Sequence, residues 1–123
     1  MRSATSPWRQ GIGAYGENVA CRLPAEKGMT ILERNWRCPT GEIDIVARDG
    51  DDLVVCEVKT RRDDSFGGAR AAVTWRKIRR LRQLAAAWLA AHPDVHPDLV
   101  RIDVVAVTRK ARGAALVEHF EGV

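Results

Sequence analysis

The chain has 123 residues, of which 46% are hydrophobic and 29% charged, and its net charge of +4 comes from 20 basic and 16 acidic residues. This length supports one domain with a hydrophobic core and is too short for two. The composition excludes a disordered or fibrous chain. No apolar run approaches the roughly 20 residues of a membrane-spanning helix, and segment 1–16 has no continuous apolar stretch, so we expect a cytoplasmic protein.

The cysteines and histidines show no pattern of a metal site or a disulfide set. Cys21, Cys38 and Cys56 have neither the short paired spacing of a zinc site nor an even count, so we expect reduced, mostly buried thiols. All three histidines lie after residue 90, and two of them precede prolines in an expected loop. A metal site built on histidine is therefore not expected.

The N-terminal part is expected to hold an arm and a helix. Ser, Thr and Pro cluster in segment 1–12 without an apolar period, which predicts a flexible arm, and residues 13–123 are expected to form a single domain. From Ala14 to about Lys27, apolar residues recur at helical spacing, and Gly28 suits the end of a helix. Pro24 interrupts this pattern, and because proline removes a backbone donor, we expect it to kink the helix or end it early.

Three strands are expected next, at Met29–Trp36, Glu42–Arg48 and Leu53–Thr60. The last two are separated by the run Asp-Gly-Asp-Asp at 49–52, which is typical of a tight turn. Such closely spaced strands predict an antiparallel meander.

A long helix and one or two further strands follow. After a loop through residues 65–68, the helix is expected to be capped by Thr74 and ended by Pro93, with apolar side chains along one side. Alternating apolar and polar residues predict a strand at Val100–Thr108, and Ala115–Phe120 is a candidate edge strand. The expected fold is an α/β sandwich of a mixed sheet and flanking helices, in the order helix, three strands, helix, strand.

Two acidic residues interrupt strands that are otherwise apolar. Asp44 lies in the run IDIVA and Glu57 in the run LVVCEV. A carboxylate among β-branched residues loses hydration and needs a hydrogen bond, a counter-charge or a metal ion. With a two-residue turn at 50–51, the antiparallel register places Asp44 opposite Glu57 on one face. Facing carboxylates repel each other unless a cation lies between them, and oxygen ligands of this kind suit Mg²⁺ or Mn²⁺.

Lys59 is the candidate for contact with a reacting phosphate. It follows Glu57 by two residues, so both side chains leave the same face, roughly 6 to 7 Å apart along the strand. Its charge would stabilise the negative charge that develops on phosphate oxygens during hydrolysis. An ion pair of Lys59 with Glu57, or with Glu42 opposite to it, is the alternative.

Positive charge is concentrated between Lys59 and Arg82. Such a local field suits a phosphate-rich partner. A solvated helix face would show the same pattern. The candidates for contact with nucleic acid are Arg61, Arg62, Arg76, Lys77, Arg79 and Arg80.

These motifs carry a family resemblance that covers most of the chain, from Gly13 to about Val107. The runs Gly41-Glu42-Ile43-Asp44 and Glu57-Val58-Lys59, followed by Phe66-Gly67 and Lys77, are similar to the YraN-like family of uncharacterised proteins. That family resembles the PD-(D/E)xK nuclease superfamily and, within it, the archaeal Holliday-junction resolvases. The resemblance implies a restriction-endonuclease-like fold and a metal-dependent phosphodiesterase site.

The resemblance also assigns roles to single residues. It implies that Asp44 and Glu57 are metal ligands, that the Val58 backbone carbonyl is a further ligand, and that Lys59 is the catalytic lysine. Glu17 matches the glutamate of the first helix, which would approach the metal directly or through water.

Two further positions complete the comparison. Lys77 matches a basic position of the second helix, where it would contact a phosphate or simply be solvated. The superfamily's proline is absent, because Ile43 precedes Asp44.

The expected function is a Mg²⁺- or Mn²⁺-dependent nuclease acting on branched or otherwise structured DNA. One alternative is a non-catalytic nucleic-acid-binding module of the same fold, and another is a protein-interaction module that uses an exposed sheet edge. The set Asp44, Glu57 and Lys59 favours the nuclease, because binding alone does not require acids near phosphates. A two-fold symmetric substrate would favour a homodimer.

Overall fold

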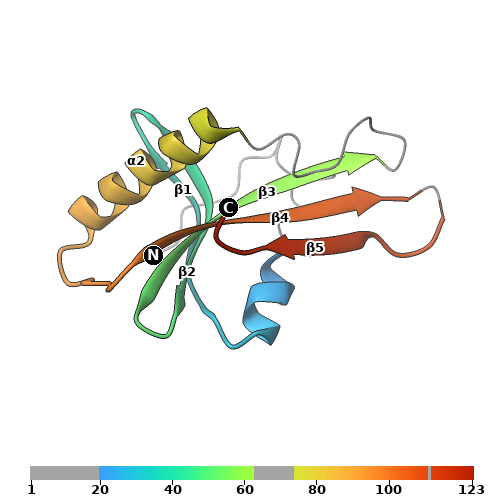
Figure 1. Ribbon diagram of the computed structural model, residues 1–123, viewed down its shortest axis with the longest axis horizontal. Helices are drawn as coiled ribbons and strands as arrows, with labels where there is room; N and C mark the ends of the chain where they lie inside the picture. The colour runs from blue at the N-terminus through green and yellow to red at the C-terminus, as the bar shows by residue number, and fades with distance from the viewer. Residues whose placement is uncertain (1–19, 63–73, 111) are drawn as a thin grey trace.

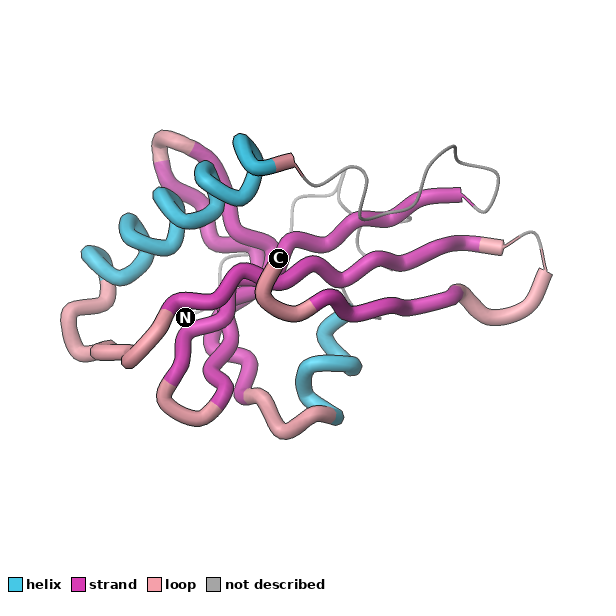
Figure 2. The backbone as a smooth tube through the Cα atoms, viewed as in Figure 1, coloured by secondary structure: helices cyan, strands magenta, loops and turns pink. Residues whose placement is uncertain are grey.

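The computed structural model describes residues 20–62, 74–110 and 112–123 and has the expected mixed α/β architecture (Figure 1, Figure 2). Helical residues 20–26 are followed by β1 (Thr30–Cys38), β2 (Gly41–Asp49), β3 (Asp52–Arg62), α2 (Trp75–Ala91), β4 (Val100–Arg109) and β5 (Leu116–Phe120). The expected order of elements is confirmed, including the last edge strand. The expected arm, Glu17 and the loop at 65–68 lie outside the described residues.

The five strands form one sheet in the order β1-β2-β3-β4-β5, so β3 is central. β3 and β4 are parallel, and the other neighbours are antiparallel. A parallel pair needs a crossover connection, and α2, which lies between β3 and β4 in the sequence, belongs to it. This crossover places α2 across one face of the sheet, while residues 20–26 lie on the other side (Figure 1).

Each face of the sheet buries its own apolar cluster. Leu81, Leu84 and Trp88 of α2 pack on alternate residues of the central strands, such as Val55. Ala20 packs on the opposite face of the sheet, against the strand residues that alternate with this first set. Because the central strands are covered on both sides, they are almost continuously apolar. Polar residues inside these strands therefore mark a site or a buried network.

Pro24 does not end the first helix early, so the early end that was expected as one of two outcomes is wrong. The helix continues through Pro24 to residue 26, and the Pro24 carbonyl accepts hydrogen bonds from the N–H groups of Lys27 and Met29. The proline side chain is fully buried. Burial of the ring against the sheet offsets the one hydrogen bond that a proline removes from a helix.

The helix α2 begins and ends where the sequence predicts. The Thr74 hydroxyl accepts a hydrogen bond from the Lys77 N–H at 3.2 Å, and the helix ends at Ala91, two residues before Pro93. The cap fixes the first helical turn, which faces the end of β3 that carries Glu57. In the described residues, no helix has the length and apolar character needed to cross a membrane.

The β2–β3 hairpin has the expected register but is paired over only part of its length. Asp49 pairs with Asp52 around the two-residue turn, where Gly50 takes a φ of +61°, and Val46 pairs with Val55. The pairing stops at Ile45 and Cys56. The expected backbone pairs of Asp44 with Glu57 and of Glu42 with Lys59 are therefore not formed.

The hairpin of β1 and β2 instead continues toward α2. Its pairing runs to Cys38 and Gly41, and the Arg80 guanidinium on α2 donates a hydrogen bond to the Thr40 carbonyl. Cys38, at the end of β1, packs against the apolar cluster that contains Leu84, and a Cβ atom added at Gly41 would meet the Leu84 side chain at 3.4 Å. The tip of this hairpin thus lies against α2, while the pairing of β2 with β3 stops at Ile45.

The three cysteines form no disulfide with one another, and only Cys56 is fully buried. Cys21 and Cys38 are half-buried. The expectation of mostly buried thiols therefore holds for one cysteine of three.

Candidate active site

Glu57, Lys59 and Lys77 form a charged cluster where the first turn of α2 faces β3. A Glu57 carboxylate oxygen, Oε2, lies 3.1 Å from the Lys77 ammonium and 3.4 Å from the Lys59 ammonium. The Glu57 side chain is only 14% exposed, whereas the two lysines are about a third exposed. Glu57 and Lys59 thus share the α2 face of the sheet, as the spacing predicts.

The Asp44 side chain reaches the same stretch of β3 from β2. Its Oδ2 accepts a hydrogen bond from the Val58 N–H at 2.8 Å, just beyond the last backbone pair of the two strands. A carboxylate oxygen has therefore taken the place of a backbone acceptor. This hydrogen bond holds the Asp44 carboxylate beside the residue that links Glu57 to Lys59.

The two lysines of the cluster differ in how readily they lose a proton. Burial and the neighbouring Lys77 ammonium together lower the pKa of Lys59, and Glu57 opposes this only in part. Burial acts to lower the pKa of Lys77 as well, but its contacts with Lys59 and Glu57 outweigh it and raise that pKa. Of the two ammonium groups, Lys59 therefore releases its proton more readily, and Lys77 holds its proton more firmly.

The donor set at this place fits a hard divalent cation. Asp44 and Glu57 supply carboxylate oxygens, which Mg²⁺ and Mn²⁺ prefer. The N–H and C=O groups of one strand residue point to the same side, so the Val58 carbonyl faces the side from which Asp44 approaches. The expected ligand pattern is thus compatible with the backbone geometry, although Glu17 lies outside the described residues.

The basic residues named from the sequence have different surroundings. Arg76 and Arg79 are exposed on α2, and Arg62 is exposed at the end of β3. Arg80 is also exposed, but it donates a hydrogen bond to the Thr40 carbonyl and so links α2 to the β1–β2 turn. Arg61 is half-buried at the end of β3, and Lys77 is directed to Glu57.

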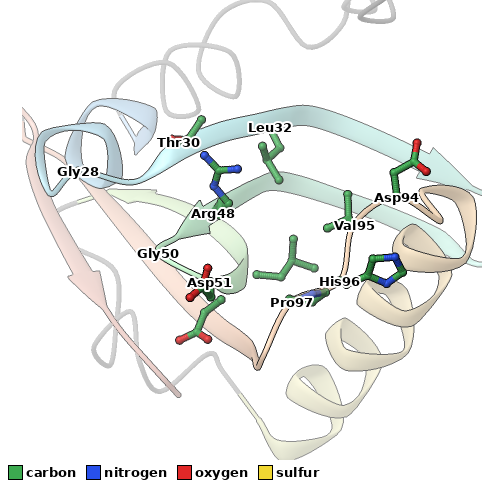
Figure 3. Close-up of a pocket in the computed structure, with 12 residues that line it drawn as sticks. Gly28, Thr30, Leu32, Arg48, Gly50, Asp51, Asp94, Val95, His96 and Pro97 are labelled. Carbon is green, nitrogen blue, oxygen red and sulfur yellow. The ribbon is translucent and has the colours of Figure 1, made fainter.

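An open hollow of about 580 Å³ lies at the far end of β3 from Lys59 (Figure 3). It is formed by the β2–β3 turn, the start of β1 and the loop between α2 and β4, and Leu53 of its lining is about 20 Å along the strand from Lys59. Asp51, Asp52 and Asp94 line it together with Arg48. The excess of carboxylates makes this hollow unfavourable for a phosphate backbone.

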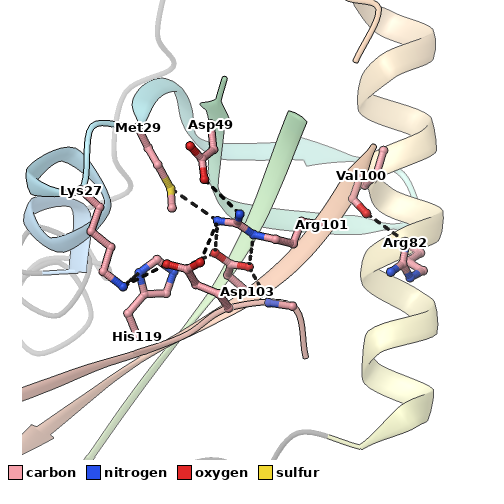
Figure 4. A network of polar contacts seen from close by, with 10 residues as sticks. Lys27, Met29, Asp49, Arg82, Val100, Arg101, Asp103 and His119 are labelled. Atoms are coloured by element: carbon pink, nitrogen blue, oxygen red, sulfur yellow. Dashed lines mark hydrogen bonds and ion pairs between the residues drawn. The ribbon is translucent and has the colours of Figure 1, made fainter. Parts of the chain in front are cut away.

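A second polar cluster is buried on the opposite face of the sheet (Figure 4). Asp103 of β4 is fully buried and accepts four hydrogen bonds, all between 2.7 and 3.0 Å, two from the Arg101 side chain, one from His119 Nε2 and one from the Gly122 N–H. The Lys27 ammonium lies 3.1 Å from His119 Nδ1. An ammonium can only donate, so His119 accepts at Nδ1 and carries its proton on Nε2.

This second cluster has the residue types of a metal site but the contacts of a structural network. The ligand atoms of Cys56, Asp103 and His119 lie within 4.8 Å of one another. Burial, followed by the nearby Asp103 charge, raises the pKa of the Cys56 thiol, as expected of an inert structural cysteine. The Asp103 oxygens are already taken by donors, including the Arg101 guanidinium. The cluster joins residues 20–27, β4 and the C-terminal residues of the chain.

Sequence reasoning found the first cluster and missed the second. It named Asp44, Glu57 and Lys59 from acids inside apolar strands, and Lys77 as a residue near phosphate. The same signal occurs at Asp103, which lies between Ile102 and Val104. Its partner His119 lies in a short strand, where a single histidine gives no pattern.

The fold and the first cluster define a small α/β protein that carries an acid–lysine site on the central strand of a mixed sheet. The chain belongs to the uncharacterised protein family UPF0102, whose family model matches residues 16–107. The resemblance to the YraN-like family is thereby confirmed.

Several curated relatives cover nearly the whole chain. A UPF0102 protein of Kineococcus radiotolerans is 62% identical over 115 residues, which are 94% of each chain. A UPF0102 protein of Beutenbergia cavernae is 58% identical over 115 residues, 94% of this chain and 97% of the relative. A UPF0102 protein of Streptomyces coelicolor is 58% identical over 116 residues, 94% of this chain and 89% of the relative.

Proposed function

We propose that this protein is a nuclease that hydrolyses phosphodiester bonds in DNA with the help of Mg²⁺ or Mn²⁺. The observation that carries this proposal is that the Asp44 side chain of β2 reaches the short stretch of β3 that carries Glu57 and Lys59. Two carboxylates and a lysine at a partly exposed strand provide a place for a cation and a positive charge for a phosphate. A purely structural ion pair would not require the second carboxylate.

Each residue has a proposed task in that reaction. The Asp44 and Glu57 carboxylates and the Val58 carbonyl would hold the metal ion, which supplies Lewis-acid stabilisation of the phosphate charge. Glu17 is proposed as a further ligand, directly or through water. Lys59 would stabilise the negative charge that develops on the phosphate.

The DNA backbone is proposed to lie along α2 and the end of β3. Arg76 and Arg79 are exposed on α2, on the helix whose first turn contacts Glu57, and Arg62 is exposed at the end of β3. The acidic hollow at the other end of the sheet would repel phosphates. Nucleic acid is thus expected at the Lys59 end only.

The double variant Arg76→Ala/Arg79→Ala tests that surface. Fewer counterions are released when phosphate contacts are lost, so the slope of log affinity against log salt should become shallower by about one for each contact removed. Fluorescence anisotropy with a labelled DNA between 50 and 200 mM salt measures this slope. The double variant Arg22→Ala/Arg48→Ala removes the same charge from exposed sites elsewhere and should leave the slope unchanged. Equal slopes in all three proteins would place the DNA on another surface.

A second candidate function is binding of nucleic acid without cleavage. It is favoured by one observation, namely that two lysine ammonium groups already neutralise the Glu57 carboxylate. In that case the acids serve to position Lys59 and Lys77 for contact with phosphates. The two candidates differ only in whether DNA is cut.

A cleavage assay with the purified protein decides between them. Labelled four-way junctions, flaps, single strands and duplexes are incubated with Mg²⁺, with Mn²⁺ or with EDTA. The nuclease proposal expects products with either metal on at least one branched substrate and none with EDTA. Binding to these DNAs with no product in any metal would establish the binding module instead. A junction-specific product would also favour action as a homodimer, since a four-way junction is two-fold symmetric.

A further inference from the structure

Trp75 is an exposed aromatic residue at the start of α2. It is 67% exposed, and it is the only aromatic among the strongly exposed large apolar side chains of the described residues. Aromatic side chains are highly buried on average, whereas single exposed apolar residues are common, so the chemistry around Trp75 decides what its exposure means. The other strongly exposed residues of this kind are Leu32, Leu99 and Leu116.

The surroundings of Trp75 are cationic rather than apolar. The Arg76 guanidinium carbon lies 5.8 Å from the centroid of the Trp75 ring. Arg79 follows one helical turn later and therefore shares a face of α2 with Trp75. An apolar protein partner would need a contiguous apolar patch, which this part of α2 does not offer. A π-face next to positive charge suits a nucleobase and its phosphate.

The position of Trp75 relative to the acid–lysine cluster is fixed by the helix cap. Thr74 accepts a hydrogen bond from the Lys77 N–H, and the Lys77 ammonium contacts Glu57 at 3.1 Å. Trp75 and Lys77 therefore belong to the same ordered turn. A helix is about 10–12 Å wide with its side chains, so a base on Trp75 would belong to a nucleotide only a few positions from one at the cluster.

We propose that Trp75 is a stacking platform for an unpaired base, and that the substrate is DNA with unpaired nucleotides next to the cleaved phosphate. This inference rests on the proposed function and names its substrate class. Inside a duplex both faces of each base are covered by neighbouring bases, so only an unpaired base can stack on an exposed ring. Arg76 and Arg79 would hold the phosphates on either side.

Binding in EDTA tests the proposal without any need for cleavage. Fluorescence anisotropy compares a 20-nucleotide oligothymidylate with a 20-base-pair duplex. Trp75→Ala should weaken binding of the single strand about 5- to 150-fold, the loss that corresponds to one base–aromatic stack, and leave duplex binding unchanged. Trp75→Phe should keep most of the affinity. Leu99→Ala removes an equally exposed apolar side chain from the loop before β4 and should change neither the single-strand affinity nor the duplex affinity.

Tryptophan fluorescence gives a second measurement that does not depend on how well Trp75→Ala folds. The single strand should quench the emission of the wild-type protein, and this quenching should be lost in Trp75→Phe although that variant still binds. Quenching that persists in Trp75→Phe, or equal losses of single-strand and duplex binding in Trp75→Ala, would overturn the proposal.

The two proposals fail in different ways. Selective loss of single-strand binding in Trp75→Ala, in a protein that cuts no DNA, would support stacking and refute the nuclease. Metal-dependent cleavage that is accompanied by unchanged single-strand binding in Trp75→Ala would support the nuclease and refute stacking.

Discussion

The Asp103→Asn variant is expected to lose about 3–5 kcal/mol of the free energy of unfolding, the usual effect of removing one partner from a buried charge pair. Asp103 is fully buried, and its four hydrogen bonds all come from donors. An asparagine would turn an N–H₂ group either toward Arg101 Nε and the Gly122 N–H or toward Arg101 Nη2 and His119 Nε2. The two donors on that side would lose their acceptor, and the Arg101 guanidinium would lose a charge partner.

The matched control for this variant is Asp49→Asn. Asp49 also accepts a hydrogen bond from Arg101, at 3.0 Å, but it is 39% exposed. Exposed ion pairs contribute little, so the control should lose about 1 kcal/mol or less. Urea unfolding of the three proteins at pH 7 measures both values. A loss below about 1 kcal/mol in Asp103→Asn would show that the buried network does not hold the fold together.

The same network predicts how stability depends on pH. Burial acts to raise the pKa of Asp103, but the hydrogen bonds from His119, Arg101 and Gly122 outweigh it, and the net pKa is lowered. A carboxyl whose folded pKa is depressed contributes stability above its unfolded value of about 4 and loses it as pH falls toward the folded pKa. The difference in urea midpoint between wild type and Asp103→Asn should therefore shrink below about pH 4.

The second large effect is expected in cleavage. If the protein is a nuclease, Glu57→Gln should abolish metal-dependent hydrolysis, because a carboxylate ligand is lost, while DNA binding is retained or strengthened by the removal of a negative charge. Lys59→Ala should slow turnover by roughly 100-fold or more, the usual effect of losing a group that stabilises transition-state charge. Asp44→Asn should behave like Glu57→Gln. Its amide oxygen can still accept from the Val58 N–H, so its fold should be intact.

These variants need a control for the change of charge alone. Glu118→Gln makes the same chemical change on an exposed side chain of β5 and should leave cleavage unchanged. Single-turnover cleavage and DNA affinity, both measured for each variant, separate binding from chemistry. Full activity in Glu57→Gln would remove the proposed site, whereas a parallel loss of binding and cleavage in Lys59→Ala would assign that lysine to affinity only.

Much of this architecture could be predicted because local signals and tertiary packing agree. Thr74 marked the start of α2, and the run at 49–52 marked a two-residue turn, which sets the register of Val46 and Val55. The common face of Glu57 and Lys59 then follows from the pleat of a strand. These features depend on neighbours in sequence, which a single chain displays directly.

The features that were missed depend on contacts between distant segments. The pairing of β2 and β3 ends at Ile45, and the tip of the β1–β2 hairpin is hydrogen-bonded to α2, some forty residues later in the chain. Pro24 stays within its helix because tertiary burial compensates for its missing donor. The same sequence signal, an acid inside an apolar strand, occurs at Asp44 and at Asp103, although only Asp44 was predicted to form a site. The two aspartates can be distinguished only by their partners in three dimensions. Asp44 reaches the partly exposed stretch of β3 that carries Glu57 and Lys59, whereas Asp103 is buried and enclosed by hydrogen-bond donors.

The hydrogen bond from the Val58 N–H to Asp44 gives that aspartate a structural role that does not depend on catalysis. Where β2 leaves β3, the Asp44 carboxylate covers a backbone N–H that would otherwise be open to pairing with another chain, and such open strand edges promote aggregation. On the nuclease proposal, a relative without that activity would still be expected to keep an acceptor here. Lys59 covers no backbone group by any described contact, so a lysine at this position would be the better marker of the proposed activity among relatives.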